Sequence, residues 1–206
     1  MNIRLIVLLI SCLILTSCRQ SEKSKEMMKQ AMDVYLRAEL NDDIKIDSSL
    51  AQTNKALEYD DKNLNALNHK AILLFRKKDS KGLNQLADQL FVLTGKPLYL
   101  GQKGMYLELE GKTQEAKEYY SRAIEKYKEY LRTDTLNFDL MLEYVGVLEA
   151  SGDSLNADKI LVDMKKMDFE DYQIEMIDLY KEQVVSKEQL IKYWKGEIEY
   201  DQIGEK

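Results

Sequence analysis

The single histidine of this 206-residue chain is the first candidate for chemistry, because imidazole titrates near neutral pH and serves as a base or a metal ligand. His69 lies in a segment with helical spacing, two residues before the small residue Ala71. No serine or carboxylate pattern accompanies it in the sequence, so neither a catalytic triad nor a metal site is indicated. We expect His69 to be solvent-exposed or partly packed.

Glycine and carboxylate patterns add no second candidate. The segment 101–104, Gly-Gln-Lys-Gly, falls within an expected helix and lacks the strand that precedes a phosphate-binding loop. Acidic residues are numerous but spread along helix faces, where pairs such as Glu118 and Arg122 form solvated ion pairs worth about 0.2–0.5 kcal/mol. The sequence therefore predicts no catalysis, no metal site and no cofactor.

Both cysteines lie near the N-terminus, Cys12 within an apolar run and Cys18 at its end. Arg4 gives the start a positive charge, and residues 5–15 are almost all apolar. The run is shorter than the roughly 20 apolar residues of a membrane-spanning helix and is typical of a signal-peptide core. If cleavage precedes Cys18, the mature chain has no other thiol, which excludes an internal disulfide and a cysteine nucleophile.

The residues Leu-Thr-Ser-Cys at 15–18 resemble the cleavage and acylation box of bacterial lipoproteins. The resemblance implies removal of a signal peptide spanning 1–17, a lipid thioether on Cys18 and usually an acylated amino terminus. Several acyl chains anchor a protein durably, since each buried methylene contributes about 0.8 kcal/mol. The polar residues 18–26 then form a lipidated tether, and Arg19 favours the outer membrane. A signal peptide cut elsewhere and an uncleaved anchor are the alternatives.

The composition favours an all-α protein, because charged residues make up 32% and apolar residues 45% of a chain with one proline. The length suits one domain or one short repeat array. A net charge of −6 without a basic stripe argues against nucleic-acid binding, because an acidic surface repels the phosphate backbone.

Three copies of a helix–turn–helix pattern follow one another, with small residues where two helices must touch. The first-helix positions are Leu67, Ala71 and Leu74; Leu100, Gly104 and Leu107; Met141, Val145 and Leu148. The second-helix positions are Leu83, Ala87 and Leu90; Ala116, Tyr120 and Ala123; Ala157, Leu161 and Met164. Turns are expected at 78–79, 111–112 and 152–153. A longer second helix in the middle copy accommodates its extra residues.

The pattern resembles the tetratricopeptide repeat, a helix pair of about 34 residues that stacks on its neighbours. An incomplete copy precedes the others, with Ala31 in its first helix, Ala56 in its second and a long loop at 41–47. The resemblance implies a helical-hairpin solenoid of about three to four repeats over residues 27–166. A generic bundle of helical hairpins is the alternative.

Residues 167–206 are expected to form C-terminal capping helices. Ile174 and Ile177 suggest one helix, and a capping box at 186–189 starts another that includes Trp194. Terminal repeats need a polar outer face, which these helices could supply.

In tetratricopeptide repeats the concave groove is lined mainly by the first helix of each pair. Carrying the groove positions across gives Asn65, Asn68, Ile72, Phe75 and Arg76; then Met105, Glu108 and Leu109; then Asp139, Leu142 and Glu149. This mixed apolar and polar set suits a peptide or a helix.

The expected function is that of a non-catalytic, membrane-anchored adaptor or assembly factor of the bacterial cell envelope. Its expected partner is another envelope protein or a peptide. The alternative is a lipoprotein that binds a small ligand or glycan in a nutrient-uptake complex. An enzyme would require titratable groups that converge around His69 or an acidic pair.

Overall fold

The computed structural model describes residues 3–37, 39–183 and 185–204, and the side chains of 3–18 and of 183 lie outside that description. The described residues contain no strand, are 79% helical, and form ten α-helices that pack in chain order. They divide into two compact units, residues 1–79 and 80–206, each of which is treated by itself. The all-α prediction is confirmed.

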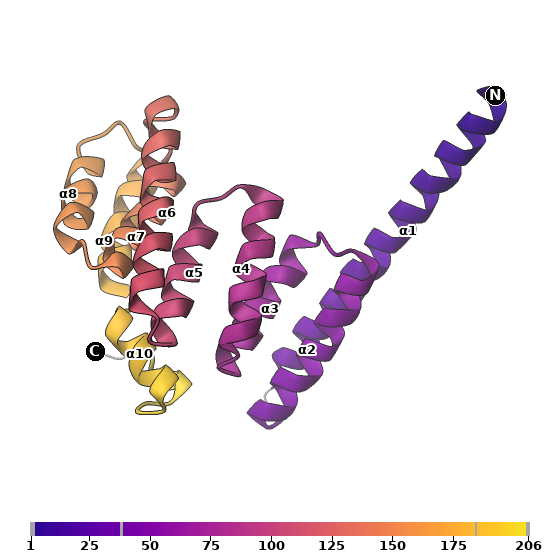
Figure 1. Cartoon of the computed structure of the whole chain (residues 1–206), viewed down its shortest axis with the longest axis horizontal. Coiled ribbons are helices and arrows are strands. Elements are labelled where there is room, and N and C mark those ends of the chain that lie inside the picture. Colours follow the sequence, from indigo (N-terminus) through magenta and orange to yellow (C-terminus); the bar gives the residue numbers. More distant parts are fainter. Residues whose placement is uncertain (1–2, 38, 184, 205–206) are drawn as a thin grey trace. The chain divides into compact units, whose positions relative to one another are not determined.

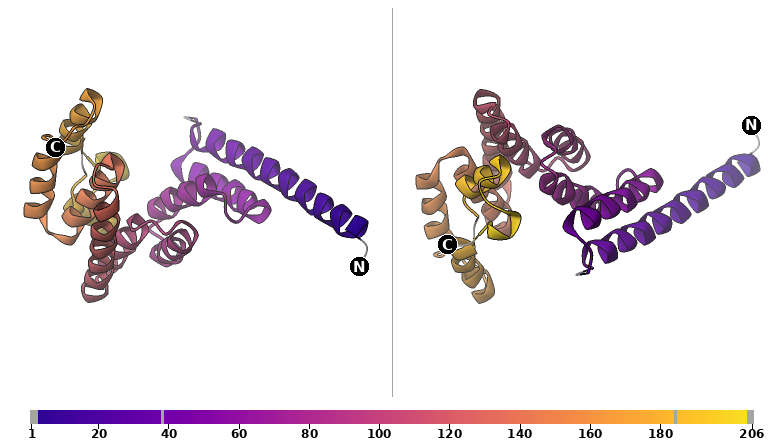
Figure 2. Two further views of the ribbon diagram at one scale, coloured as in Figure 1. Left: turned by 90° about the horizontal axis from the view of Figure 1, so that it is seen from above. Right: turned by 90° about the horizontal axis from the view of Figure 1, so that it is seen from below.

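Unit 1 contains α1 (Ile3–Tyr35), α2 (Asp42–Tyr59) and α3 (Leu64–Arg76). The helices α1 and α2 run side by side in opposite directions (Figures 1 and 2), and α3 packs against α2. The core of unit 1 holds small residues, Ala31, Ala56 and Ala66, which allow the helices to approach closely. The helix α1 continues without a break through 18–26, where the sequence predicts a tether.

The prediction of a long loop at 41–47 is wrong, because α2 begins at Asp42. The side chain of Asn41 accepts a hydrogen bond from the backbone N–H of Asp43 at 2.8 Å and caps the helix. Asp42 and Asp43 place negative charge in the first turn, where the helix dipole favours it.

Unit 2 contains the remaining helices, and consecutive members pack on one another from α4 to α8 (Figure 1). Their bounds are α4 (Ser80–Thr94), α5 (Leu98–Leu109), α6 (Thr113–Thr133), α7 (Phe138–Ser151), α8 (Ser154–Met164), α9 (Asp171–Gln183) and α10 (Lys187–Lys195), followed by the 3-10 turn Tyr200–Gln202. The 21 residues of α6 confirm the longer helix predicted for the middle copy. Every predicted core position is buried except Ala71, which is half-buried.

The predicted small-residue contacts are close helix approaches. A Cβ atom on Gly104 of α5 would lie 2.7 Å from the Tyr120 ring of α6. One on Gly101 would lie 2.5 Å from a methyl group of Val147 in α7. Glycine at these two positions therefore allows α5 to touch both α6 and α7.

The three predicted turns share one geometry. Lys78, Gly111 and Gly152 have positive φ angles of 56°, 78° and 92°. In each turn the next residue's N–H bonds the carbonyl five residues earlier at 2.9 Å, which terminates the preceding helix. The repeated helix–turn–helix pattern of the sequence thus corresponds to the same backbone conformation in all three turns.

Candidate functional site

The predicted groove residues are divided between the units. The α3 set, in unit 1, presents Asn65, Asn68 and Ile72 to solvent, while Phe75 is half-buried. The side chain of Arg76 is mostly covered, because it bonds Asp42 at 2.7 Å and the Tyr35 hydroxyl at 3.2 Å.

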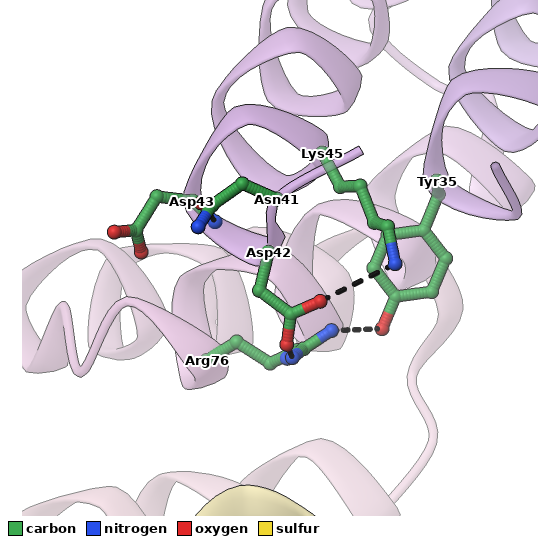
Figure 3. Close-up of polar contacts among 6 residues, drawn as sticks. All are labelled: Tyr35, Asn41, Asp42, Asp43, Lys45 and Arg76. Carbon is green, nitrogen blue, oxygen red and sulfur yellow. Dashed lines mark hydrogen bonds and ion pairs between the residues drawn. The ribbon is translucent and has the colours of Figure 1, made fainter. Parts of the chain in front are cut away.

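Figure 3 shows how these groups converge from α1, α2 and α3. Burial opposes the charge of Arg76, but its bonds to Tyr35 and Asp42 outweigh burial and raise its pKa. The hydrogen bond from Arg76, and then that from Lys45, lower the pKa of Asp42. The guanidinium also lies 5.7 Å from the centre of the Tyr35 ring. Arg76 therefore holds unit 1 together at this end of its helices.

In unit 2, two of the three predicted groove carboxylates bind the chain's own C-terminal helices. Glu108 accepts a hydrogen bond from the Tyr120 hydroxyl and pairs with Lys187 of α10, both at 3.0 Å. Glu149 accepts a hydrogen bond from Tyr180 of α9 at 2.8 Å.

The remaining predicted positions in unit 2 differ in exposure. Met105, Leu109 and Leu142 are half-buried, and Asp139 is exposed. The second and third sets therefore keep apolar groups at the surface, while their two glutamates are already engaged.

His69 is buried, 5% exposed, so the expectation of a solvent-exposed or partly packed side chain is wrong. Its Nε2 lies 2.8 Å from the hydroxyl of Ser49 in α2, and its ring packs edge-on against Tyr35 at 5.3 Å. Ser49 in turn donates its hydroxyl proton to the carbonyl of Ala31 in α1 at 2.8 Å. The three helices of unit 1 meet at this chain of hydrogen bonds.

The direction of these bonds fixes the role of the pair. Because the one proton of Ser49 goes to Ala31, His69 must donate its own Nε2–H to Ser49. Burial lowers the pKa of His69, which favours the neutral ring. In a serine nucleophile the hydroxyl donates to the histidine instead, and here Ser49 is fully buried. The contact is structural.

The sequence interpretation missed a cavity of about 450 Å³ between α4, α5 and α6, with the buried Leu107 in its wall. Two ion pairs line it: Lys103 lies 2.6 Å from Asp88, and Lys112 lies 2.6 Å from Glu110. Lys103 also lies 4.5 Å above the Tyr119 ring. Charges from three helices thus meet in one concave site.

Asn84, a residue of the cavity wall, has one buried polar atom without a partner in the described part of the chain. Asn84 donates hydrogen bonds to the Ser80 carbonyl at 3.0 Å and to Glu110 at 3.2 Å, yet its Oδ1 is buried with no partner among the described residues. Such an acceptor costs about 1–3 kcal/mol unless a donor reaches it. A hydroxyl, an amide N–H or an ammonium group would satisfy it.

Lys103, Glu110 and Lys112 are held in their charged forms. Burial disfavours the Lys103 charge, but the bonds to Asp88 and Tyr119 prevail and raise its pKa. The hydrogen bond from Lys112 lowers the pKa of Glu110, and the reverse interaction raises that of Lys112. These shifts move the pKa values further from pH 7, and groups with such pKa values are better suited to binding than to proton transfer.

The helix α9 carries a second candidate site. Tyr172, Met176 and Leu179 are 61%, 42% and 48% exposed and share one helix face. Ile177 on the other side of the helix is fully buried, and the half-buried Tyr180 borders the stripe one turn after Met176. The exposed surface of α9 is otherwise charged, so the stripe interrupts the polar outer face expected for the C-terminal helices.

The lipidation site falls where the structure gives only backbone. Cys18 belongs to α1, but its side chain lies outside the described part. Among the described residues, no helix is long and apolar enough to cross a membrane. Within the same part of the chain, no group of three histidine, cysteine or acidic side chains is arranged to hold a metal ion.

Comparison with known proteins adds no family. No protein-family model matches the chain. A comparison with curated proteins finds no significant match. Function is therefore argued from the sites themselves.

Proposed function

We propose that this chain is a lipid-anchored, non-catalytic adaptor or assembly factor of the bacterial cell envelope that binds another protein. The lipoprotein-like sequence at 15–18 supports the anchor at Cys18. The helix pairs, their three alike turns and the close approach at Gly104 support a solenoid like that of tetratricopeptide repeats.

The observation that carries the proposal is the apolar stripe on α9, formed by Tyr172, Met176 and Leu179. Single exposed apolar side chains are common on protein surfaces, but three aligned along one helix are typical of an interaction surface. The buried Ile177 and the hydrogen bond from Tyr180 to Glu149 fix the helix, so the stripe is presented on an ordered element.

The groove positions have a smaller part in this proposal. Glu108 and Glu149 are occupied by α10 and α9, so a partner at those positions would have to replace internal contacts. The exposed α3 residues Asn65, Asn68 and Ile72 remain candidates for a contact in unit 1.

The test is mild crosslinking of the membrane-anchored protein in cells, followed by affinity purification and mass spectrometry. We expect a stoichiometric envelope protein that is lost with Met176→Lys. It should be retained with Leu155→Lys, a matched change at an α8 side chain that is 87% exposed. Recovery of no protein partner from wild-type cells would refute the proposal.

A second candidate function rests on the unpaired Oδ1 of Asn84 in the α4–α6 cavity. Its volume of about 450 Å³ is within the range of small-molecule sites. Because four of the charges that line it are paired with each other, Lys103 with Asp88 and Lys112 with Glu110, a neutral ligand rich in hydroxyl groups, such as a glycan, suits it. In the same purification, a retained glycan that disappears with Asn84→Ala would favour this alternative.

A further inference from the structure

We propose that the apolar stripe of α9 is the docking seam for a basic amphipathic helix of the partner protein. This inference rests on the proposed adaptor function and specifies the chemistry of the partner at that site. It is carried by the spacing of the apolar residues and by the charges beside them.

The spacing of the stripe is that of a helix–helix seam. Met176 follows Tyr172 by four residues and Leu179 follows Met176 by three, which is the alternation of core positions in a heptad. All three side chains are at least 42% exposed, so nothing in the described part of the chain covers them fully. A second helix laid along α9 would bury them.

The charges beside the seam are acidic. Glu175 and Glu182 are exposed and seven residues apart, each next to a seam position in the heptad. No ion pair with either glutamate occurs among the described residues. In coiled coils the side chains at such flanking positions select the partner's charges.

Two other charged groups of α9, Asp178 and Lys181, are used within unit 2. Asp178 pairs with Lys165, and Lys181 pairs with Asp158 of α8 at 3.4 Å. These pairs connect α9 to its neighbour, and the charges that remain at the flanking positions of the seam are the carboxylates of Glu175 and Glu182, opposite the uncharged Gln173 and Tyr180. A partner helix with lysine or arginine beside its own apolar seam is the complementary surface.

Two other occupants are disfavoured by the same charges. A second copy docked through α9 would bring Glu175 and Glu182 close to their equivalents, and like charges across a seam repel. An anionic lipid surface would likewise repel this edge of the helix. The seam therefore selects for a cationic partner.

The experiment uses the full-length lipidated protein in nanodiscs of neutral lipid and two synthetic 21-residue helical peptides. Both peptides carry leucine at the seam positions; one has lysine and the other glutamate at all flanking positions. Fluorescence anisotropy should show at least about tenfold tighter binding of the lysine peptide, a preference that weakens as salt rises.

Charge reversal makes the test specific. The double variant Glu175→Lys/Glu182→Lys should exchange the preference, so that the glutamate peptide binds more tightly. The matched variant Glu125→Lys/Glu129→Lys, at exposed glutamates of α6, should keep the wild-type preference. Met176→Ser should weaken binding of the lysine peptide without changing the sign of the preference.

The inference is overturned if the wild-type protein binds both peptides equally, or if the two charge-reversed variants behave alike. Self-association that Met176→Ser abolishes would assign the seam to a second copy, and binding to anionic vesicles through Glu175 and Glu182 would assign it to lipid. A cellular partner that is lost with Met176→Lys but not with the charge reversal would refute the basic helix and leave the adaptor function intact.

Discussion

At the scale of single residues, the most informative group is an imidazole that the fold keeps neutral. His69 is buried between three helices, and its hydrogen bond to Ser49 requires a donor on the ring but no positive charge. Burial lowers its pKa below the ordinary value of 6.5. The unfolded chain therefore takes up a proton at a higher pH than the folded chain does.

This difference predicts a pH-dependent stability. Above about pH 6.5 the ring is neutral in both states, and the full stability is present. Below pH 6.5 the unfolded state is protonated first, so the free energy of unfolding should fall by up to about 1.4 kcal/mol per pH unit until the folded pKa is reached. Urea unfolding of wild type and His69→Gln at pH 7.5, 6.5 and 5.5 measures the effect.

Glutamine is the matched replacement, because it is uncharged throughout and its amide can still donate to Ser49. We expect the difference in the free energy of unfolding between wild type and His69→Gln to shrink or to change sign as the pH falls. A gap that is the same at all three values would mean that His69 titrates alike in the folded and unfolded chains.

At the scale of helices, the hairpins could be predicted because their signals are local. Apolar and small residues recur at helical spacing. The turns at 111–112 and 152–153 each contain a glycine, the residue that adopts a left-handed backbone conformation most readily. The α2 start was missed because Asn41 was assigned to a loop, although asparagine followed by two aspartates is also typical of a helix N-terminus.

Sequence reasoning fails for polar contacts between helices that are distant in the sequence. The partner of His69 is Ser49, 20 residues away, and Arg76 reaches Asp42 across 34 residues and Tyr35 across 41. No local pattern links these positions. The cavity around Asn84 likewise combines side chains from three helices. Each of its polar residues alone is typical of a solvated helix surface, so the sequence contains no pattern that indicates a site.

The contact of α5 with α6 gives the prediction at this scale. Alanine is favoured over glycine by about 1 kcal/mol inside a helix. At Gly104, however, the new methyl group would lie 2.7 Å from the buried Tyr120 ring, whose hydroxyl is held by Glu108. We expect Gly104→Ala to lower the free energy of unfolding by about 1–3 kcal/mol.

The control for this prediction lies in α7. An alanine methyl group at Gly146 would lie 3.4 Å from the Tyr180 hydroxyl, which is near ordinary contact distance. Gly146→Ala should therefore be neutral or stabilising in the same denaturant titration. Equal effects of the two variants would show that α5 and α6 do not approach as closely as the Gly104 contact requires.

At the scale of the whole molecule, each unit contains a cluster of buried apolar residues, and the candidate sites fall within units. The Arg76 and His69 clusters belong to unit 1, whereas the Asn84 cavity and the α9 seam belong to unit 2. The proposed anchor lies at the start of unit 1. An adaptor built in this way would be tethered through one unit and bind through the other.

The anchor itself gives the last prediction, because the body offers little else to hold a membrane. The chain carries a net charge of −6, which an anionic membrane surface repels. The apolar run at 5–15 is shorter than a spanning helix, so the attachment that we propose would depend on acyl chains at Cys18. Cys18→Ala should abolish metabolic labelling with a fatty-acid analogue and move the protein to the soluble fraction after an alkaline carbonate wash.

Cys12→Ala, which changes the other cysteine of the same segment, should remain labelled and membrane-bound. Continued labelling of Cys18→Ala would place the acylation elsewhere, and an unlabelled Cys18→Ala that stays in the membrane would show that the uncleaved N-terminal segment is an anchor in its own right.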